Sequence, residues 1–202
     1  MTEDQMSWDE FYKKIEGREP RPLLRDVLDA FAKEISPGSR LAIDLGCGDG
    51  TETLVLLAHG WNVLAVDGEP AAIRRLLEKM PETGAVSLQT QVAKFEELVL
   101  PPADLIHASF SLPFCQPGYF HALWEKIVSA VKPGGRFAGQ FFGVHDSWAS
   151  DPEMTFHTEA QVHAMFETFK VESFVETDEA GQAVSGPKHW HLFTVIAKKT
   201  RD

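Results

Sequence analysis

The chain has 202 residues, of which 44% are hydrophobic and 24% are charged, and its formal net charge is −11. These values are ordinary for a globular protein and exclude a disordered chain, which combines low hydrophobicity with high net charge. The acidic excess disfavours a general affinity for nucleic acid, because phosphate binding needs a basic surface, although composition does not exclude a local basic patch.

The length predicts one domain over residues 1–202, with an N-terminal helical segment at 1–35 and a core at 38–199. We expect a cytoplasmic protein, because no stretch approaches the ~18 apolar residues of a membrane span and residues 1–10 do not resemble a signal peptide. The two cysteines, Cys47 and Cys115, lie in Gly-rich or apolar segments and do not indicate a disulfide framework.

The N-terminal segment contains two helix signals. Ser7 and Glu10 form a capping-box pattern that predicts a short helix ending at Gly17. After the prolines at 20 and 22, apolar residues recur at helical spacing over 24–35, and residues 36–38 stop that helix.

Beyond residue 38, strand-like and helix-like patterns alternate, which predicts an α/β layered fold. The apolar runs expected as strands are 41–45, 62–66, 86–91, 105–109, 136–142, 171–176 and 190–198. The helical patterns between them cover 51–58, 70–80, 119–131 and 158–169. The last two strands are expected to pair antiparallel, because the turn between them contains Gly181 and Gly186.

The most informative stretch runs from Ala42 to Gly50, where a buried strand meets a turn with glycines at 46, 48 and 50. Glycines let a ligand lie directly on the backbone. Asp67 ends the next strand about 20 residues on, where a carboxylate can accept hydrogen bonds from a ribose diol. Together these features favour a nucleoside-binding βαβ unit over an ordinary Gly-rich turn.

The residues around the turn narrow the choice of nucleoside. A dinucleotide fingerprint would place its third glycine at position 51, which is Thr here. Asp49 and Glu52 add negative charge where a pyrophosphate would approach the helix. The sequence therefore favours a cationic, phosphate-free nucleoside and disfavours a nicotinamide-dependent oxidoreductase.

Four short segments follow one another along the chain: Asp-Leu-Gly-Cys-Gly-Asp-Gly at 44–50, Ala-Val-Asp-Gly at 65–68, Ala-Asp-Leu-Ile at 103–106 and Val-Lys-Pro-Gly-Gly-Arg-Phe at 131–137. In this order they resemble motifs of the class I S-adenosylmethionine-dependent methyltransferases. The resemblance covers residues 38–199 and implies S-adenosyl-L-methionine as cofactor. The size of the chain and its short helical N-terminus also resemble those of small-molecule methyltransferases of the tellurite-resistance and thiopurine types.

The resemblance implies a Rossmann-like three-layer sandwich, with a mostly parallel seven-stranded sheet ordered 3-2-1-4-5-7-6 and an antiparallel last strand. It also assigns cofactor roles around the sheet edge. Asp44 would support the turn, Gly46, Cys47 and Gly48 would line the methionine part, and Asp67 would hold the ribose. Adenine would be held by backbone groups or the Gln91 amide, because Gln91, Val92 and Ala93 stand where the family often has an acid. The remaining positions in this set are Gly50 and Gly68 in the motifs, and Ser109 and Phe110 beneath the sulfonium.

Residues 1–22 have two interpretations. Aromatic residues on a short helix can simply pack, but two arginines in a Gly/Pro-rich loop can reach a carboxylate. We favour a lid over the cofactor that contributes Tyr12 and Arg21 to the substrate pocket.

Three further side chains are candidates for the acceptor pocket. His145 follows the fifth strand and is either a general base or a surface loop residue. His189 and His191 face one side of the last strand and Trp190 the other, and we expect His189, with His145, Phe110 and Trp148, to lie beside the methyl group. We expect no metal site, because the His-x-His pair has no evident third ligand in the sequence.

The sequence therefore predicts a methyltransferase that acts on a small molecule, with no nucleic acid or membrane partner. A non-catalytic S-adenosylmethionine-binding module or partner subunit is the alternative. The retained Lys132-Pro133-Gly134-Gly135 turn and the aromatic and His residues at strand ends favour an enzyme. The oligomeric state is not predicted.

Overall fold

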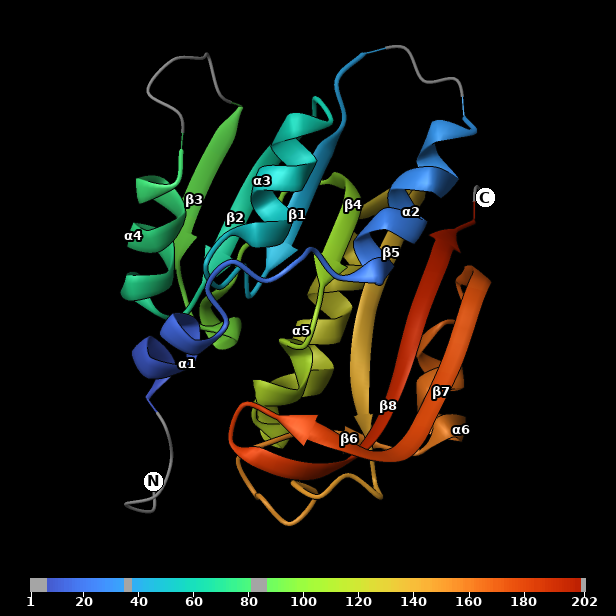
Figure 1. Cartoon of the computed structure of the whole chain (residues 1–202). Helices are drawn as coiled ribbons and strands as arrows, with labels where there is room; N and C mark the ends of the chain where they lie inside the picture. The colour runs from blue at the N-terminus through green and yellow to red at the C-terminus, as the bar shows by residue number, and fades with distance from the viewer. Residues whose placement is uncertain (1–6, 35–37, 81–86, 201–202) are drawn as a thin grey trace.

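The computed structural model describes residues 7–34, 38–80 and 87–200 and contains one mixed β-sheet (Figure 1). Its main path follows the order β3-β2-β1-β4-β5-β8-β7. Neighbours from β3 to β5 pair parallel, and β8 pairs antiparallel with both β5 and β7. The strands are β1 Leu41–Leu45, β2 Asn62–Asp67, β3 Leu88–Val92, β4 Ala103–Ala108, β5 Val131–Gly143, β6 Phe156–His157, β7 Phe169–Ala183 and β8 Gly186–Lys199.

The predicted sheet order is confirmed, since β8 is the antiparallel last strand inserted between β5 and β7. The short strand β6 was not predicted. It pairs parallel with the end of β5 and lies off the main path.

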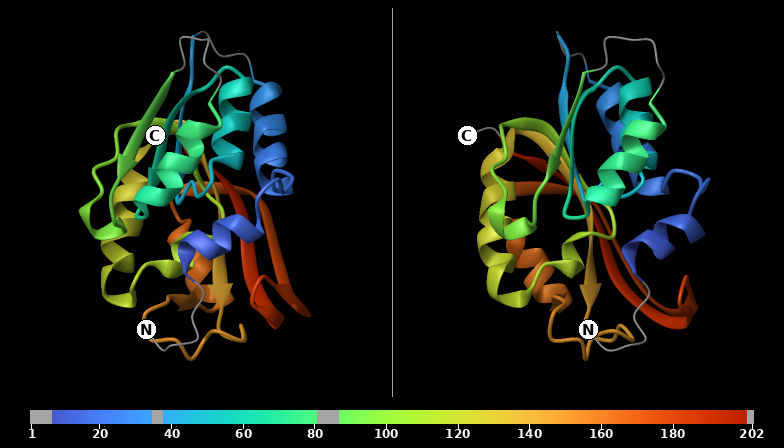
Figure 2. Two further views of the ribbon diagram at one scale, coloured as in Figure 1. Left: turned by 60° about the vertical axis from the view of Figure 1, so that its left-hand side comes forward. Right: turned by 90° about the vertical axis from the view of Figure 1, so that its left-hand side faces the viewer.

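Helices cover both faces of the sheet (Figure 2). Buried side chains of α2 and α3 pack on one face with Ala42, Val63 and Leu105, and α4 packs beside them on Ala65. The side chains of α5 and α6 pack on the opposite face in the largest apolar cluster. The helices are α1 Trp8–Lys14, α2 Pro22–Ala32, α3 Thr51–Ala58, α4 Pro70–Glu78, α5 Pro117–Ala130 and α6 Glu159–Met165, with 3-10 turns η1 Phe95–Glu97 and η2 Leu112–Phe114.

Capping boxes operate at the starts of two helices, but α1 ends at Lys14 and not at the predicted Gly17, and α2 covers Pro22–Ala32 and not 24–35. Ser7 and Glu10 form a capping box at α1, and Thr158 and Gln161 form another at α6. The last helix is shorter than the predicted 158–169, because Phe169 already begins β7. None of the described helices is long and apolar enough to cross a membrane.

The β7–β8 hairpin is longer than the sequence predicted, and its curved end reaches beneath the body of the sheet (Figure 1). β7 is mostly exposed and polar, so it lacks the apolar alternation that would mark a strand. Gly181 lies inside β7, not in the turn, and a Cβ there would lie 2.8 Å from Trp190 Cδ1. The glycine therefore makes room for the tryptophan ring.

Some sequence expectations fall outside the described residues. They are the polar N-terminus over 1–6, the helix stop at 36 and 37, and the start of the third strand at Val86.

Candidate functional site

The glycine-rich turn leaves the carboxyl end of β1, in the middle of the sheet. The N–H groups of Gly46 and Cys47 both donate to the Val66 carbonyl, at 2.8 and 2.9 Å, and tie the turn to β2. Gly46 has φ 72°, and a Cβ there would lie 2.3 Å from Ser111 Cβ. Only glycine fits this position, since both the backbone and the neighbouring chain exclude a side chain.

The turn presents bare backbone on its outer side. Gly48 and Gly50 are also left-handed, with φ 55° and 83°, and Gly50 precedes the first turn of α3. A Cβ on Gly48 would lie 3.2 Å from Tyr12 Cε1, so a side chain of α1 rests on the turn. A ligand on this backbone would therefore lie against the ring of Tyr12.

Asp67 ends β2 beside the turn, and only 7% of it is exposed. Its two carboxylate oxygens accept the N–H groups of Gly48 and Glu69, each at 2.9 Å. Burial raises the pKa of Asp67 above its ordinary value, while these backbone hydrogen bonds act in the opposite direction. Each oxygen keeps a second lone pair for a ligand hydroxyl, so this carboxylate fits a ribose diol.

Asp44 lies beneath the turn and is 2% exposed. One of its oxygens lies 2.9 Å from His107 Nδ1, and the other accepts the Thr53 hydroxyl at 2.7 Å. Asp44 on β1 thus connects to β4 through His107 and to α3 through Thr53. Burial also raises the pKa of the Cys47 thiol well above its ordinary value, which makes it a poor nucleophile.

The two acidic residues expected to repel a pyrophosphate are both neutralised. Asp49 is paired with Lys79 at 2.5 Å, and Glu52 accepts two hydrogen bonds from the Arg18 guanidinium. The charge argument against a dinucleotide is therefore weaker than the sequence suggested.

The expected adenine-binding residues gather on the other side of Asp67. Val92 pairs with Asp67 in the β2–β3 register, and the Ala93 N–H donates to the Asp67 carbonyl at 3.0 Å. A Cβ on Gly68 would lie 3.9 Å from the Ala93 carbonyl oxygen, so these residues line one edge. Val92 is exposed and offers an apolar surface there, and Gln91 precedes it on β3.

Phe110 follows β4 with a left-handed φ of 52°, a strained conformation for a side chain of this size. Gln140 on β5 fixes this exit, because its Oε1 accepts both the Phe110 N–H and the Ser109 hydroxyl at 3.1 Å. Sequence reasoning did not single out Gln140, because a lone amide in a strand carries no local signal. Strain in this loop suits a site in which the ring of Phe110 must be held toward a ligand.

The N-terminal segment brings Tyr12 and Arg21 to this same edge. Tyr12 is 5% exposed, and its burial raises the pKa of the phenol. The guanidinium carbon of Arg21 lies 4.1 Å from the centre of the Phe110 ring. Trp8 of α1 makes an edge contact with Phe114, with 5.0 Å between the ring centres, and so holds α1 against the turn η2.

An aromatic wall continues from Phe110. We use this name for Phe110, Phe142, Trp148 and Trp190, whose rings lie within 5.7–6.1 Å of one another in successive pairs. The Lys188 ammonium lies 3.8 Å from the centre of the Trp148 ring and 4.5 Å from that of Trp190, and it pairs with buried Asp146. Trp148 thus lies in one aromatic cluster with Phe142 and Trp190, and its role in an acceptor pocket stays a prediction.

The prediction that His145 and His189 join this pocket is wrong. His189 Nε2 lies 2.6 Å from Asp178 Oδ1, and His145 Nδ1 lies 2.9 Å from Asp178 Oδ2, on the face of the hairpin opposite Trp190. The alternation along β8 was correctly described, but it is Trp190 that points toward Phe110. Neither histidine is therefore a catalytic candidate.

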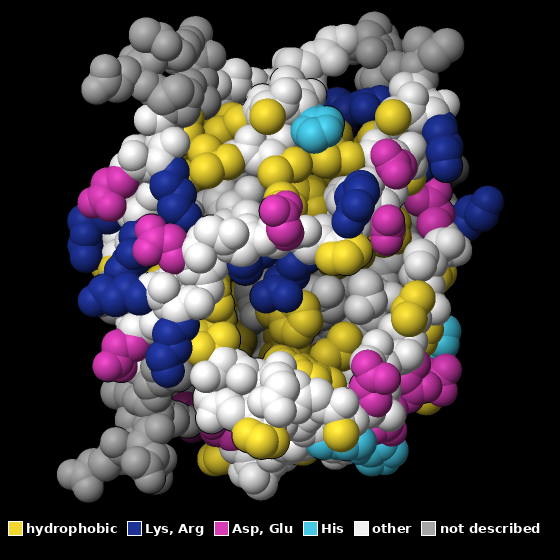
Figure 3. Space-filling model, in the orientation of Figure 1, with side chains coloured by type: hydrophobic (Ala, Val, Ile, Leu, Met, Phe, Trp, Pro, Cys, Tyr) yellow, Lys and Arg dark blue, Asp and Glu magenta, His cyan; other side chains and the backbone are white. Residues whose placement is uncertain are grey.

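Figure 3 shows a hollow in this face of the molecule, with hydrophobic side chains on its floor and Lys or Arg side chains at its upper rim. The contacts of Arg21 and Phe110 agree with that arrangement. A separate cavity of about 230 Å³ lies at the amino ends of β1 and β2, near Arg40 and Trp61. It is at the opposite edge of the sheet from the glycine turn, and ligands of such folds bind at the carboxyl edge.

Comparison with known proteins gives a consistent result. Residues 42–135 match the model of a family described as a methyltransferase domain. An uncharacterized methyltransferase from Synechocystis sp. is 28% identical over 144 residues, which cover 71% of this chain and 64% of that protein. The chain thus spans somewhat less than two thirds of this relative.

Two solved structures have similar folds. TehB from Haemophilus influenzae aligns with a TM-score of 0.74 and 18% identity, covering 95% of this chain and 66% of its own. The N-methyltransferase NodS from Bradyrhizobium japonicum, in complex with S-adenosyl-L-homocysteine, aligns with a TM-score of 0.66 and 15% identity over 96% of this chain and 98% of its own. At this identity the likeness concerns the fold.

Proposed function

We propose that the chain is a class I S-adenosylmethionine-dependent methyltransferase that transfers a methyl group from S-adenosyl-L-methionine to a small-molecule acceptor. One observation carries the proposal: the glycine turn and Asp67 lie at the same edge as Arg21 and the aromatic wall. A nucleoside site and a separate, mostly apolar acceptor pocket thus meet at Phe110.

The cofactor would follow the edge of the sheet. In this proposal Asp67 holds the ribose hydroxyls, and the backbone of Gly46, Cys47 and Gly48 lines the methionine part above Asp44. Adenine lies on the exposed side chain of Val92, between Gly68 and Ala93, with the Gln91 amide within the same edge. Gly50 starts α3 and keeps the turn tight against Leu76.

When bound, S-adenosylmethionine supplies a methyl group on a positively charged sulfur. The chain's own residues orient the acceptor and exclude water. Phe110, held by Gln140, would form the floor beneath the sulfur with Ser109, and Tyr12 would cover the turn from above. The segment before α2 thus acts as a lid on the core, with the whole chain as one domain.

The acceptor class follows from Arg21. Its side chain has no carboxylate partner among the residues that the structure describes, because Arg18 occupies Glu52. Burial, together with neighbouring Arg18, lowers the pKa of the Arg21 guanidinium, so an anion there would relieve an unfavourable charge. We therefore propose that Arg21 anchors an oxyanion of the acceptor, such as a carboxylate, while the aromatic wall holds its apolar part.

No histidine among the described residues faces this pocket, so we assign none as a general base. An acceptor whose nucleophilic atom is unprotonated near neutral pH needs no general base. The acidity of the chain disfavours a nucleic-acid acceptor, and its two buried free thiols suit the cytoplasm.

The test is transfer of a labelled methyl group to a panel of small carboxylates and their uncharged amides. Arg21→Gln should raise KM for a carboxylate acceptor by roughly 10–100-fold, the loss of a charged hydrogen bond, and leave cofactor affinity unchanged. Exposed Arg25→Gln on α2 is the matched control.

Two outcomes would contradict parts of this proposal. If Arg21→Gln weakens cofactor binding and leaves the acceptor KM unchanged, Arg21 binds the carboxylate of the cofactor instead. If the chain binds the cofactor in calorimetry but transfers no methyl group to any acceptor, the non-catalytic binding module is the better description.

A further inference from the structure

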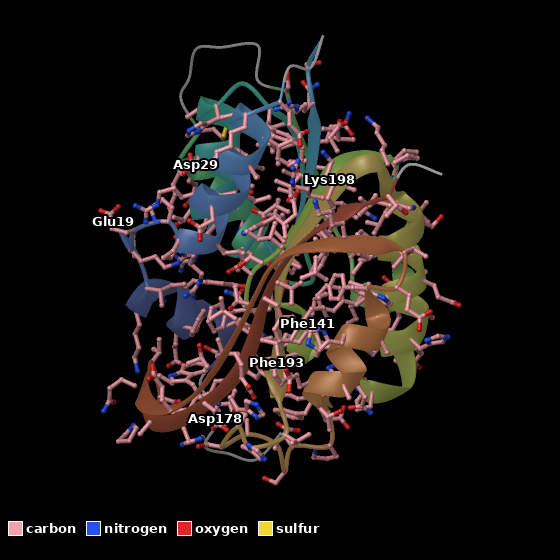
Figure 4. All side chains as sticks on the ribbon, turned by 90° about the vertical axis from the view of Figure 1, so that its right-hand side faces the viewer. Glu19, Asp29, Phe141, Asp178, Phe193 and Lys198 are labelled. Carbon is pink, nitrogen blue, oxygen red and sulfur yellow. The ribbon has the colours of Figure 1, made fainter. Side chains whose placement is uncertain are left out.

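A cluster of histidines and carboxylates lies on the outer face of the β7–β8 hairpin, away from the aromatic wall. We call it the histidine–carboxylate cluster, and its members are His145, Glu176, Asp178, His189 and His191. Figure 4 labels Asp178 near the curved end of the hairpin, and in Figure 3 histidine and acidic side chains gather at the lower right of the molecule.

Strand register brings these residues together. Asp178 on β7 pairs directly with His191 on β8, and His189 lies two positions away on the same face. The loop after β5 adds His145, whose ring stacks on that of His191 at 4.6 Å between centres. One possible ligand atom from each of His145, Asp178 and His191 lies within 4.8 Å of the others.

Asp178 is the centre of the cluster. His189 lies at one of its oxygens, at 2.6 Å, and His145 at the other, at 2.9 Å. Both oxygens of Asp178 thus face imidazole nitrogens. His191 Nδ1 accepts the His145 backbone N–H at 3.0 Å, so Nε2 is the nitrogen of this ring left for an ion. Glu176 adds a second carboxylate beside it, 2.9 Å from Nε2.

We propose that His145, Asp178 and His191, with His189 at the second oxygen of Asp178, form a binding site for one divalent transition-metal ion such as Zn²⁺, Ni²⁺ or Cu²⁺. Imidazole and carboxylate donors together select these ions over Mg²⁺ and Ca²⁺, which take oxygen ligands. With neutral imidazoles the cluster carries two negative charges, which a dication balances. An imidazole that now donates an N–H to Asp178 becomes a ligand when that proton moves to its other nitrogen or to water.

The sequence shows only the His-x-His pair. The third and fourth groups come from β7 and from the loop after β5, about 10 and about 45 residues away along the chain. Sequence reasoning therefore found no third ligand, and the expectation of no metal site rested on that gap.

An ion here would join the loop after β5 to the hairpin. Asp146 and Lys188, the immediate neighbours of His145 and His189, form the buried pair behind the aromatic wall. The metal would therefore stabilise the outer side of the same wall that we propose holds the acceptor. The site itself is independent of methyl transfer.

The experiment uses the untagged full chain, freed of metal with a chelator, and titrates it with ZnCl₂ in calorimetry. We expect one ion per chain and a rise in melting temperature, with no response to MgCl₂. With CuCl₂, electron paramagnetic resonance should show couplings to imidazole nitrogens.

Asp178→Asn and His145→Ala should each weaken Zn²⁺ binding at least 10-fold, consistent with the loss of one ligand. His145 is two-thirds exposed, so its replacement leaves the fold intact and keeps the test valid if Asp178→Asn folds poorly. His163→Ala is the matched control, since His163 on α6 also lies beside an acid, Glu159, at 3.5 Å but has no second imidazole in that pair. Absence of Zn²⁺ binding, or equal binding by wild type and His145→Ala, overturns the proposal.

Discussion

At the start of β8, from Lys188 to His191, alternate side chains point toward the pocket or away from it. The sequence predicts that alternate residues point to opposite faces, but not which set faces the site. That parity depends on how β8 pairs with β5 and β7, which is set by contacts far apart in the chain. The Gly46–Gly50 turn and Asp67 were predictable, because their chemistry is carried by residues close together in sequence.

Lys188 carries a buried charge that no sequence pattern indicated. Its ammonium is buried against Trp148 and Trp190, and Asp146 is its only carboxylate partner among the residues that the structure describes. Asp146 also accepts the Trp148 N–H at 3.0 Å. Burial lowers the pKa of Lys188, and the pair with Asp146 acts against this. The pair therefore lies behind the side of the wall formed by Trp148 and Trp190.

We expect Asp146→Ala to lower the free energy of unfolding by about 3–5 kcal/mol, because it leaves a buried charge uncompensated. Lys188→Met should cost less, since Asp146 retains two backbone N–H donors, from Trp148 and His191. Urea unfolding followed by tryptophan fluorescence measures both values. Equal losses for the two variants would show that the lysine charge is not the main cost.

At the scale of elements, the short helices and the βαβ units matched their local signals, whereas the hairpin did not. Caps and breakers are encoded within a few residues, so α1, α3 and α6 began where predicted. β7 is an exposed edge strand whose extent is set by pairing with β8 along its whole length. Its polar sequence contains no signal for that pairing.

Helix α1 and the loop to α2 should be the least stable part of the site. Trp8 on Phe114 and Tyr12 over Gly48 hold α1, and Arg18 on Glu52 holds the loop that follows it. We expect amide exchange over residues 7–22 to slow on addition of S-adenosylhomocysteine, because a ligand beneath a lid stabilises its closed state. Mass spectrometry of the exchanged chain measures it, with α5 as internal reference. If the exchange rate over residues 7–22 does not change on addition of the ligand, the segment packs on the core and is not a lid.

Another element-scale prediction concerns the end of α2. Glu34 accepts hydrogen bonds from Arg136 on β5 and Lys198 on β8, each at 2.6 Å, and so joins the helix to the sheet. The Arg136 hydrogen bond is the main cause that lowers the pKa of Glu34 from 4.5 to about 2. Because the folded pKa is the lower one, this stabilisation is present above the unfolded value and is lost as pH falls.

Glu34→Gln should therefore reduce the free energy of unfolding by about 1 kcal/mol near neutral pH, since water screens this partly exposed group. The difference from wild type should shrink as pH falls from 4.5 toward about 2. Urea titrations across this range measure it, with exposed Glu125→Gln as control. If the difference in free energy of unfolding stays constant with pH, the ionisation of Glu34 is not its cause.

At the scale of the molecule, the proposed cofactor site connects parts that are distant in the chain. The turn and Asp67 belong to the parallel half of the sheet, Tyr12 and Arg21 to the N-terminal segment, and Phe110 contacts the hairpin through Trp190. A ligand that binds only the folded chain stabilises all of these together. At 100-fold excess over its Kd the gain is about 2.7 kcal/mol.

We therefore expect S-adenosylhomocysteine at such an excess to raise the melting temperature by roughly 5–10 °C, the shift that this free energy gives in a chain of this size. Asp67→Ala should lose most of the shift, because the ribose hydrogen bonds to a carboxylate contribute ~1.5–3 kcal/mol. Asp29→Ala, an exposed carboxylate on α2, should behave as wild type. Differential scanning calorimetry measures all three chains. If Asp67→Ala is stabilised as strongly as wild type, the ligand binds elsewhere and Asp67 does not hold the ribose.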